Sequence, residues 1–455
     1  MSAITSGILL FTSCMEIPER DILPLYAYSY SDENTNIVAE VSIVTNSISI
    51  PENVDISIPY LKYNKSWLFI LTQDDCKQDA YCRTWAAING KPLLRDKSQY
   101  YNAVNLASGD MPRKVYYLGK TLGSTDGAGN EVRFAFTTTL SAEEVWMRKS
   151  ATPNAFQMYK GLIWDNVREM LNYDIGIAFH DLMADDETDL NDLVKHYNIA
   201  QNIIMQQLNG RGCKTLAEPS GKRAYIDAAR LYSPIKIMTA QNKESYAEEL
   251  IPGAVNSSIQ GKVVKRGFYK SNEWMNVISK LLSKPFNKRE ALCAGIHGAD
   301  SMMIEHLLEL NNVYGKDGDD SMWAPSLEEY YEYTEYRLNT VIEKRVSGDT
   351  LKLKITMPTR EYFYYPSITI NLNNISMADI KSVTSSGIVT GMSYAGFGDG
   401  VMINIDCRKH LLDHAIHYVM KYETTGISSD LADAYYFVRR IKESGAKTDL
   451  LARLK

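Results

Sequence analysis

Seven short apolar runs recur along the first two thirds of the chain, and this repetition constrains the fold more than any other feature. Several of them are apolar nearly throughout, as strands covered on both faces of a parallel sheet must be. The runs are WLFILT (67–72), VRFAFTT (132–138), DIGIAFH (174–180), CKTLAEP (213–219), IKIMTA (235–240), KVVKRGF (262–268) and ALCAGIH (291–297). Helix-like stretches separate most of them, with the best candidates at 154–173, 187–210, 222–232 and 271–284. Strands that alternate with helices predict a parallel α/β sheet, and seven repeats indicate a barrel.

The candidate helix over 187–210 carries its own boundary signals. Asp189 is a suitable cap at its start, and Gly210 or Gly212 is a suitable stop at its end. The segment 91–131, by contrast, is rich in Gly and Asp at GSTDGAGN and is expected to be an insertion.

The pattern changes on both sides of this repeat. Residues 21–66 alternate short strand-like pieces with Pro, Asn and Ser, which predicts an N-terminal β segment. Beyond residue 346, pieces such as GDTLKLKITMP and GVMINIDC have period-two character, which is typical of a small β-sandwich-like module, and two helical stretches follow them. The expected domains are a lipoprotein signal over 1–20, the N-terminal β segment over 21–66, an α/β barrel over 67–345 and a C-terminal β-rich module over 346–455.

Composition excludes some classes of partner. The chain has 455 residues, is 45% hydrophobic and has a formal net charge of −6, without a block rich in Lys or Arg. It therefore lacks the electrostatic footprint of a nucleic-acid-binding protein. The cysteines after Cys14 have no CxxC spacing, so a zinc finger is not indicated.

The first residues, MSAITSGILLFTSC, resemble a bacterial lipoprotein signal of the Bacteroidetes surface type, in which the cysteine, here Cys14, is lipidated. The alternative is a frayed apolar terminus. No later run approaches the roughly 20 apolar residues needed to cross a bilayer. We therefore expect a protein of the cell envelope that is lipid-anchored, periplasmic or extracellular.

Titratable residues stand at the ends of three predicted strands. Asp74 and Asp75 follow the first, His180 with Asp181 ends the third, and His297 ends the seventh. The carboxyl ends of parallel barrel strands share one rim, so these groups should converge. A carboxylate and an imidazole can hold a divalent metal while a second acid takes protons and a second histidine protonates a leaving group. The alternative for each alone is an ordinary one, a turn or helix cap for the acids and a hydrogen-bonded loop residue for His180.

The same segments resemble the polysaccharide deacetylases of the NodB-homology class, carbohydrate esterase family four, over about residues 61–345. LTQDDC resembles the T-F-D-D motif, YDIGIAFHDLMADD the strand that carries the H-x-x-x-H metal motif, and LCAGIHGAD the last motif. The resemblance implies a distorted seven-stranded (β/α) barrel and an enzyme that uses a divalent ion, most often zinc, to remove N- or O-acetyl groups from a polysaccharide or oligosaccharide. It also implies that Asp74 is the catalytic base, that Asp75 and His180 are metal ligands and that His297 is the general acid.

Two positions depart from the family pattern. Ala184 stands where the second metal histidine is expected. Asp185 and Asp186 follow it and could supply an oxygen ligand, and Asp185 is predicted to be the third ligand. Ala217 in AEPSG stands where the family has the arginine that orients the base, so that Arg266 or Arg223 would have to substitute. These departures motivate an alternative, a surface glycan-binding lipoprotein that keeps the barrel with an impaired site.

Other residues suit carbohydrate binding less specifically. Trp323 lies shortly after the last barrel strand and is predicted, with Arg266, to contact the substrate. The tyrosines at 330, 333 and 336 have helical spacing and are expected to pack in the core. His410, His414 and His417 share a helical face with aliphatic neighbours, which favours a structural cluster over a metal site. A glycosidase would need acids on two strands, and the available pair is Glu218 with Asp74.

Overall fold

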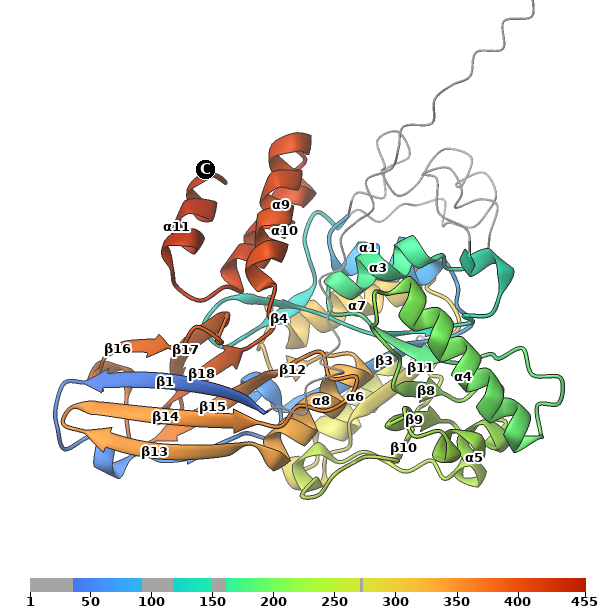
Figure 1. Cartoon of the computed structure of the whole chain (residues 1–455), viewed down its shortest axis with the longest axis horizontal. Coiled ribbons are helices and arrows are strands. Elements are labelled where there is room, and N and C mark those ends of the chain that lie inside the picture. The colour runs from blue at the N-terminus through green and yellow to red at the C-terminus, as the bar shows by residue number, and fades with distance from the viewer. Residues whose placement is uncertain (1–35, 92–117, 149–160, 271–272) are drawn as a thin grey trace, which may run out of the picture.

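The computed structural model describes residues 36–91, 118–148, 161–270 and 273–455 (Figure 1). The proposed lipoprotein signal and Cys14 lie outside these residues, as do the first part of the N-terminal β segment and most of the insertion.

A curled sheet of seven parallel strands forms the centre of the molecule, in the order β10-β9-β8-β7-β6-β3-β11, and the short strand β12 extends it beside β3. The bounds are β3 Trp67–Gln73, β6 Thr137–Leu140, β7 Gly176–Phe179, β8 Thr215–Ala217, β9 Ile237–Ala240, β10 Val263–Lys265, β11 Leu292–Ile296 and β12 Met322–Trp323. All neighbouring pairs are parallel. This arrangement confirms the predicted α/β barrel of the NodB type.

Strand β3 shows why the apolar runs carry no alternation. All seven of its residues are buried. Leu68 and Ile70 belong to the core inside the curl, whereas Phe69 and Leu71 pack in the core that also contains residues of the covering helices. Both faces of the strand are covered, so both need apolar side chains.

The two outer strands of the sheet meet through a single residue beyond β10. The amide of Gly267 donates to the carbonyl of Cys293, and the amide of Gly295 donates to the carbonyl of Gly267, both at 2.9 Å. Gly267 thereby forms an isolated parallel bridge with Ala294 of β11. The segment after β10 is held against β11 at the end of the sheet where the polar residues lie.

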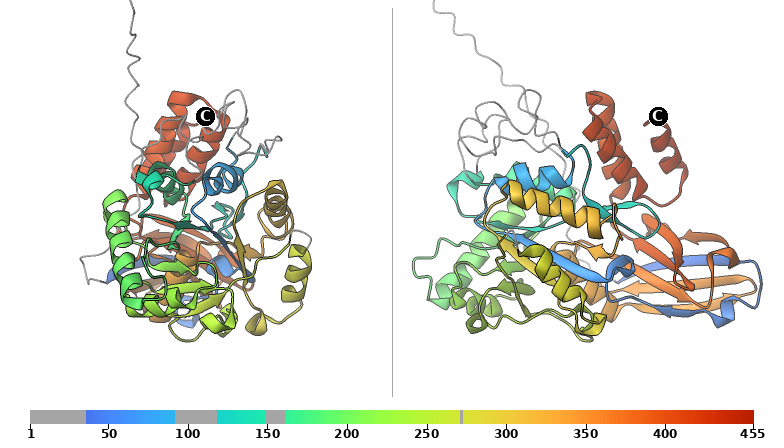
Figure 2. Two further views of the ribbon diagram at one scale, coloured as in Figure 1. Left: turned by 90° about the vertical axis from the view of Figure 1, so that its right-hand side faces the viewer. Right: turned by 180° about the vertical axis from the view of Figure 1, so that it is seen from behind.

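Helices cover the outer face of the curled sheet (Figures 1 and 2). Their bounds are α1 Ala86–Ile88, α3 Trp164–Asn172, α4 Leu190–Gln207, α5 Arg223–Leu231, α6 Trp274–Leu282 and α7 Ser301–Tyr314, whereas α8 Leu327–Asn339 packs in the core inside the curl. The boundary signals predicted for α4 are confirmed: the Asp189 carboxylate accepts from the amides of Asn191 and Asp192, and Gly210, three residues past the end, has φ of 87°. Helix α8 contacts β3, β7, β9 and β15, and its tyrosines at 330, 333 and 336 are buried as predicted.

Two antiparallel sheets form the β-sandwich-like module, in the orders β13-β14-β1-β16 and β17-β18-β15-β2. The bounds are β1 Ile37–Thr45, β2 Asp55–Ser57, β13 Val341–Ser347, β14 Thr350–Met357, β15 Ser367–Asn373, β16 Ile380–Ser385, β17 Gly391–Phe397 and β18 Gly400–Asp406. Strand β1 lies between β14 and β16, so the N-terminal β segment is built into a sheet of C-terminal strands, as the blue strand among orange ones in Figures 1 and 2 shows.

The run 132–138, expected to be one strand, is divided in the structure. β5 Glu131–Arg133 pairs in a hairpin with β4 Gly123–Thr125, and the parallel strand β6 begins at Thr137. The amide of Ala135 donates to Ala324 and the carbonyl of Phe136 accepts from Gly176. The bond from Gly176 belongs to the parallel pairing of β6 with β7, whereas the amide of Ala135 is bonded to the segment after β12, outside the predicted strand pairing.

Three helices end the chain, α9 Leu411–Thr425, α10 Ser428–Arg439 and α11 Gly445–Ala452, and stand together above the sandwich in Figure 1. The first two were expected from the sequence, and α11 was not. Among the described residues, no helix combines the length and apolar character that a bilayer span requires.

Candidate active site

The two adjacent acids after β3 are separated by a sharp backbone turn. Asp74 is buried, and its amide donates to the carbonyl of Ile296 on β11 at 2.8 Å. Asp75 and Cys76 have φ of 66° and 47°, a backbone conformation that residues other than Gly rarely adopt. The amide of Cys76 donates to the Thr139 hydroxyl at 3.1 Å, which holds the turn against β6. As a result the Asp75 side chain is partly exposed while the Asp74 side chain faces the interior.

Arg266 holds the buried acid. Its Nη1 lies 2.7 Å from Oδ1 of Asp74, and its Nη2 donates to the carbonyl of Glu218 at 2.7 Å. The guanidinium and the carboxylate are both almost fully buried, and such a pair is mutually dependent because either charge alone would be costly to bury. The carbonyl that accepts from Arg266 belongs to the residue after Ala217. Arg266 therefore brings its guanidinium to the end of β8 from another segment, whereas in the family pattern the arginine belongs to β8 itself. Arg223, the other candidate, lies on the surface and pairs with Asp227.

His180 follows β7 and is oriented by the neighbouring strand end. Its Nδ1 lies 2.8 Å from the carbonyl of Ala217. A carbonyl can only accept, so Nδ1 carries the proton and the lone pair of the neutral ring lies on Nε2. Nε2 lies 3.7 Å from Oδ1 of Asp75. Burial alone would lower the pKa of His180, but the Asp75 carboxylate and the nearby Asp74 and Asp181 raise it above its ordinary value.

Asp75 is the most strongly anionic group of the site. The His180 imidazole and the Lys77 ammonium, which lies 2.6 Å from Oδ2, hold the pKa of Asp75 well below its usual range, against the effect of its partial burial. The charge of His297 contributes in the same direction. A carboxylate that stays ionised at any ordinary pH is available as a ligand for a cation.

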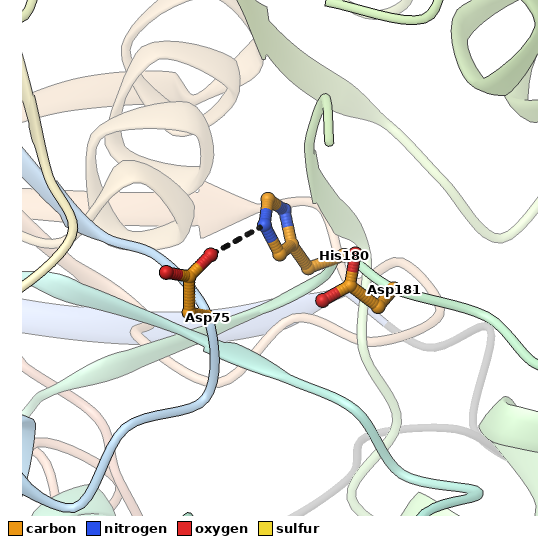
Figure 3. Close-up of side chains that lie close together, drawn as sticks. All are labelled: Asp75, His180 and Asp181. Atoms are coloured by element: carbon orange, nitrogen blue, oxygen red, sulfur yellow. Dashed lines mark ion pairs between the residues drawn. The ribbon is translucent and has the colours of Figure 1, made fainter. Parts of the chain in front are cut away.

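Asp75, His180 and Asp181 form a set of potential metal ligands (Figure 3). One atom from each lies within 4.8 Å of the others. The 3.7 Å between Nε2 and Oδ1 is too long for a hydrogen bond, but it is close to the roughly 3.4 Å that separates two ligands of a tetrahedral ion. The free Nε2 lone pair and two carboxylates fit a divalent ion, and the backbone carbonyl on Nδ1 is the outer contact that ligating histidines usually have.

Asp181 and Asp185 differ in position. Asp181 belongs to the ligand set, whereas Asp185, the predicted third ligand, lies outside it. The loop after His180 turns away toward α4, where the amide of Asp185 donates to the Asp192 carboxylate at 2.8 Å. Asp181 is recognisable in the sequence as a titratable residue at a strand end. The prediction of Asp185 instead depends on the spacing of the H-x-x-x-H motif, whose second position is Ala184, the residue before Asp185.

His297 comes to the same rim from β11. The residue before it, Ile296, pairs with Gln73 at the end of β3, next to Asp74. The imidazole is exposed and stacks on Phe268, with ring centroids 4.7 Å apart and planes at 23°. The three strand ends after β3, β7 and β11 thus meet as the sequence predicts.

Trp323 does not reach this rim. Strand β12 pairs Met322 and Trp323 with Trp67 and Leu68, at the amino end of β3, whereas the acids follow its carboxyl end. The Trp323 side chain is 1% exposed and packs edge-on against Tyr333. The structure therefore brings Arg266 to the predicted site and leaves Trp323 in the core below it.

Two further predictions concern Glu218, whose carbonyl accepts from Arg266, and the histidines around α9. Glu218, the proposed partner of Asp74 in a glycosidase, is fully buried and accepts a hydrogen bond from the Ser245 hydroxyl. On α9, His414 is buried with its ring centroid 4.1 Å from that of Phe437, and His410 pairs with Asp413. Among the described residues the three histidines form no group with metal-ligand spacing.

The curled parallel sheet defines an α/β barrel of the NodB type, and at one rim it carries a paired buried acid, a carboxylate–histidine cluster and a second histidine. The family model described as Putative polysaccharide deacetylase matches residues 39–455. The chain belongs to this family of polysaccharide deacetylases, as the resemblance of its motifs predicted. No curated protein matches the chain.

Proposed function

We propose that the protein is a metal-dependent hydrolase that removes acetyl groups from an acetylated polysaccharide or oligosaccharide. The observation that supports this most is the convergence of Arg266-bound Asp74, the Asp75–His180–Asp181 cluster and His297 at one rim of the barrel. Membership of the deacetylase family supports the substrate class.

Each residue has a role in this proposal. Asp74 accepts a proton from the attacking water, and Arg266, which donates to Oδ1 of Asp74, orients its carboxylate. Asp75, His180 and Asp181 would hold a divalent ion, with zinc as the proposed metal, which would supply Lewis-acid polarisation of the acetyl carbonyl. His297 donates a proton to the departing nitrogen or oxygen as its bond to the acetyl carbon breaks. The products are acetate and a free amine or hydroxyl group on the sugar.

The test is acetate release by the purified protein, with and without added Zn²⁺, from an N-acetylated chitooligosaccharide and from an O-acetylated xylan. Asp74→Asn should reduce the rate by about a hundredfold or more, because a positioned general base contributes at least about that factor. Asp399→Asn, in an exposed turn of the sandwich, is the matched control and should leave the rate unchanged. Normal turnover by the Asp74→Asn variant would refute the assigned role.

The ligand set has its own test. Asp181→Asn should weaken Zn²⁺ binding, measured by titration calorimetry and by metal content after dialysis, by about tenfold or more, since a ligating carboxylate is lost. Asp185→Asn should leave binding unchanged. The reverse result would restore the sequence-based assignment of Asp185. A protein that binds acetylated glycan, but that neither binds metal nor releases acetate, would instead be the glycan-binding lipoprotein considered as the alternative.

We also propose that the protein is attached to the cell envelope through a lipid on Cys14. Metabolic labelling with a radioactive fatty acid should label the wild-type protein in a bacterial host and not the Cys14→Ser variant. Equal labelling of both, or of neither, would contradict the anchor.

A further inference from the structure

The ring of Phe268, two residues beyond Arg266, touches two groups on which the proposed reaction depends. One is the imidazole of His297, with centroids 4.7 Å apart and near-parallel planes. The other is the guanidinium of Arg266, whose central carbon lies 5.4 Å from the centre of the Phe268 ring. Arg266 in turn binds Asp74. One phenyl ring thus contacts both the proposed acid and the arginine that holds the proposed base.

The position of this ring is fixed by the bridge that joins β10 to β11. Gly267 is hydrogen-bonded to Cys293 and Gly295, which places the Phe268 side chain over β11. A Cβ at Gly295 would lie 2.6 Å from Cζ of Phe268, so the ring occupies space that every residue except glycine would fill. The phenyl ring is therefore seated directly on the backbone of the strand that ends at His297.

The backbone beyond His297 is held from the other side. Oδ2 of Asp79 accepts from the amide of Ala299 at 2.8 Å, and Nη1 of Arg83 donates to the Ala299 carbonyl at 2.9 Å. Gln73, the last residue of β3, donates to Oδ1 of Asp79 at 2.9 Å. These contacts fix the main chain around His297 but leave its side chain free to turn.

Apart from the Phe268 ring, few contacts restrict the orientation of the His297 imidazole. His297 is exposed, and no side chain of the described residues hydrogen-bonds to its ring. A general acid must lie within hydrogen-bond reach of the atom that it protonates, and free rotation of an exposed ring would keep it from that position much of the time. Stacking on a fixed aromatic ring restricts the orientation of the imidazole plane.

We propose that Phe268 is a positioning residue that sets the orientation of His297 for proton donation and couples it to the Arg266–Asp74 pair. This inference rests on the proposed function, in which His297 is the acid. Phe268 itself carries no group that takes part in proton transfer.

The test compares Phe268→Leu, which keeps an apolar side chain but removes the ring, with Phe268→Tyr, which keeps the ring. In acetate-release assays kcat of the Leu variant should fall about ten- to a hundredfold, the scale of a misplaced catalytic group, with a much smaller change in KM. The Tyr variant should stay near the wild-type kcat. Phe286→Leu, which removes an aromatic contact with Tyr60 elsewhere, is the control and should have no effect. A wild-type kcat in Phe268→Leu would overturn the proposal.

A second readout does not depend on activity. In protein labelled at its histidines, the ring protons of His297, assigned by their loss in His297→Gln, should be shifted upfield by the phenyl ring in wild type and in Phe268→Tyr, and not in Phe268→Leu. An unshifted His297 signal in the wild type would overturn the proposal even if the variants failed to fold. If the wild-type protein releases no acetate but the shift is present, the proposed function fails and the stacking stands.

Discussion

Arg266 reaches Asp74 from the end of β10, while the position that the family reserves for an arginine holds Ala217. The guanidinium bonds to the carbonyl of Glu218, the residue after Ala217, so Arg266 brings its charge to the end of the strand on which the family has its arginine. The sequence offered Arg266 or Arg223 as the substitute. The choice between them depends on barrel closure, which brings β10 toward β3 and leaves Arg223 on a surface helix.

This relocation makes a reciprocal prediction. Arg266→Ala should destabilise the protein by about 3–5 kcal/mol and abolish most acetate release, because it leaves the Asp74 carboxylate buried without its partner. The double variant Ala217→Arg with Arg266→Ala should recover a substantial part of both, since the new arginine starts beside the same carbonyl. Urea unfolding and acetate release measure the two effects. A double variant no better than Arg266→Ala would show that the β10 origin of the arginine is essential.

At the scale of elements, local signals predicted α4 well. A capping acid, an amphipathic run and a glycine in a left-handed conformation specify a helix from neighbouring residues alone. The division of run 132–138 was not predictable in this way. Its composition suits a strand throughout, but its first part pairs with β4 in a hairpin and the amide of Ala135 is bonded to Ala324, which is far away in the sequence.

The cap of α4 yields an element-scale prediction. Asp189→Ala should lower the free energy of unfolding by about 1 kcal/mol, because the amides of Asn191 and Asp192 lose their acceptor. Asp189→Asn should cost much less, since its side-chain oxygen can still accept. Chemical denaturation of the two variants checks the difference, and equal stabilities would show that the cap contributes nothing.

At the scale of the whole molecule, Asp433 of α10 joins the C-terminal helices to the barrel. It is fully buried and binds Lys91, Arg133 and the hydroxyl of Tyr173, the last two at 2.5 and 2.6 Å. Burial alone would raise the pKa of Asp433, but Lys91 and Arg133 lower it to about 2. The folded state therefore holds this carboxylate ionised below the pH at which the unfolded chain takes up the proton.

The sign of the pH dependence follows from that depressed pKa. The stability from Asp433 should be fully present above about pH 4, the ordinary aspartate pKa, and be lost as pH falls toward 2. Asp433→Asn should lower the melting temperature at pH 7. Between pH 4 and pH 2 the melting temperature of this variant should fall less than that of the wild type. Melting curves across this range test it. Parallel losses in both proteins would rule out Asp433 as a source of the acid sensitivity.

The sequence by itself determined the class of the molecule: seven buried strands, the helices between them, and acids and histidines at particular strand ends. The strands and helices follow from the periodicity of neighbouring residues. The common position of the polar residues follows from the general rule that the carboxyl ends of parallel barrel strands share one rim. Tertiary structure alone decided which arginine binds Asp74, that Asp181 joins Asp75 and His180, that Phe268 lies under His297, and that β1 pairs with β14. Each of these depends on how closely distant segments approach in the closed barrel and sandwich, and a linear pattern does not encode that distance.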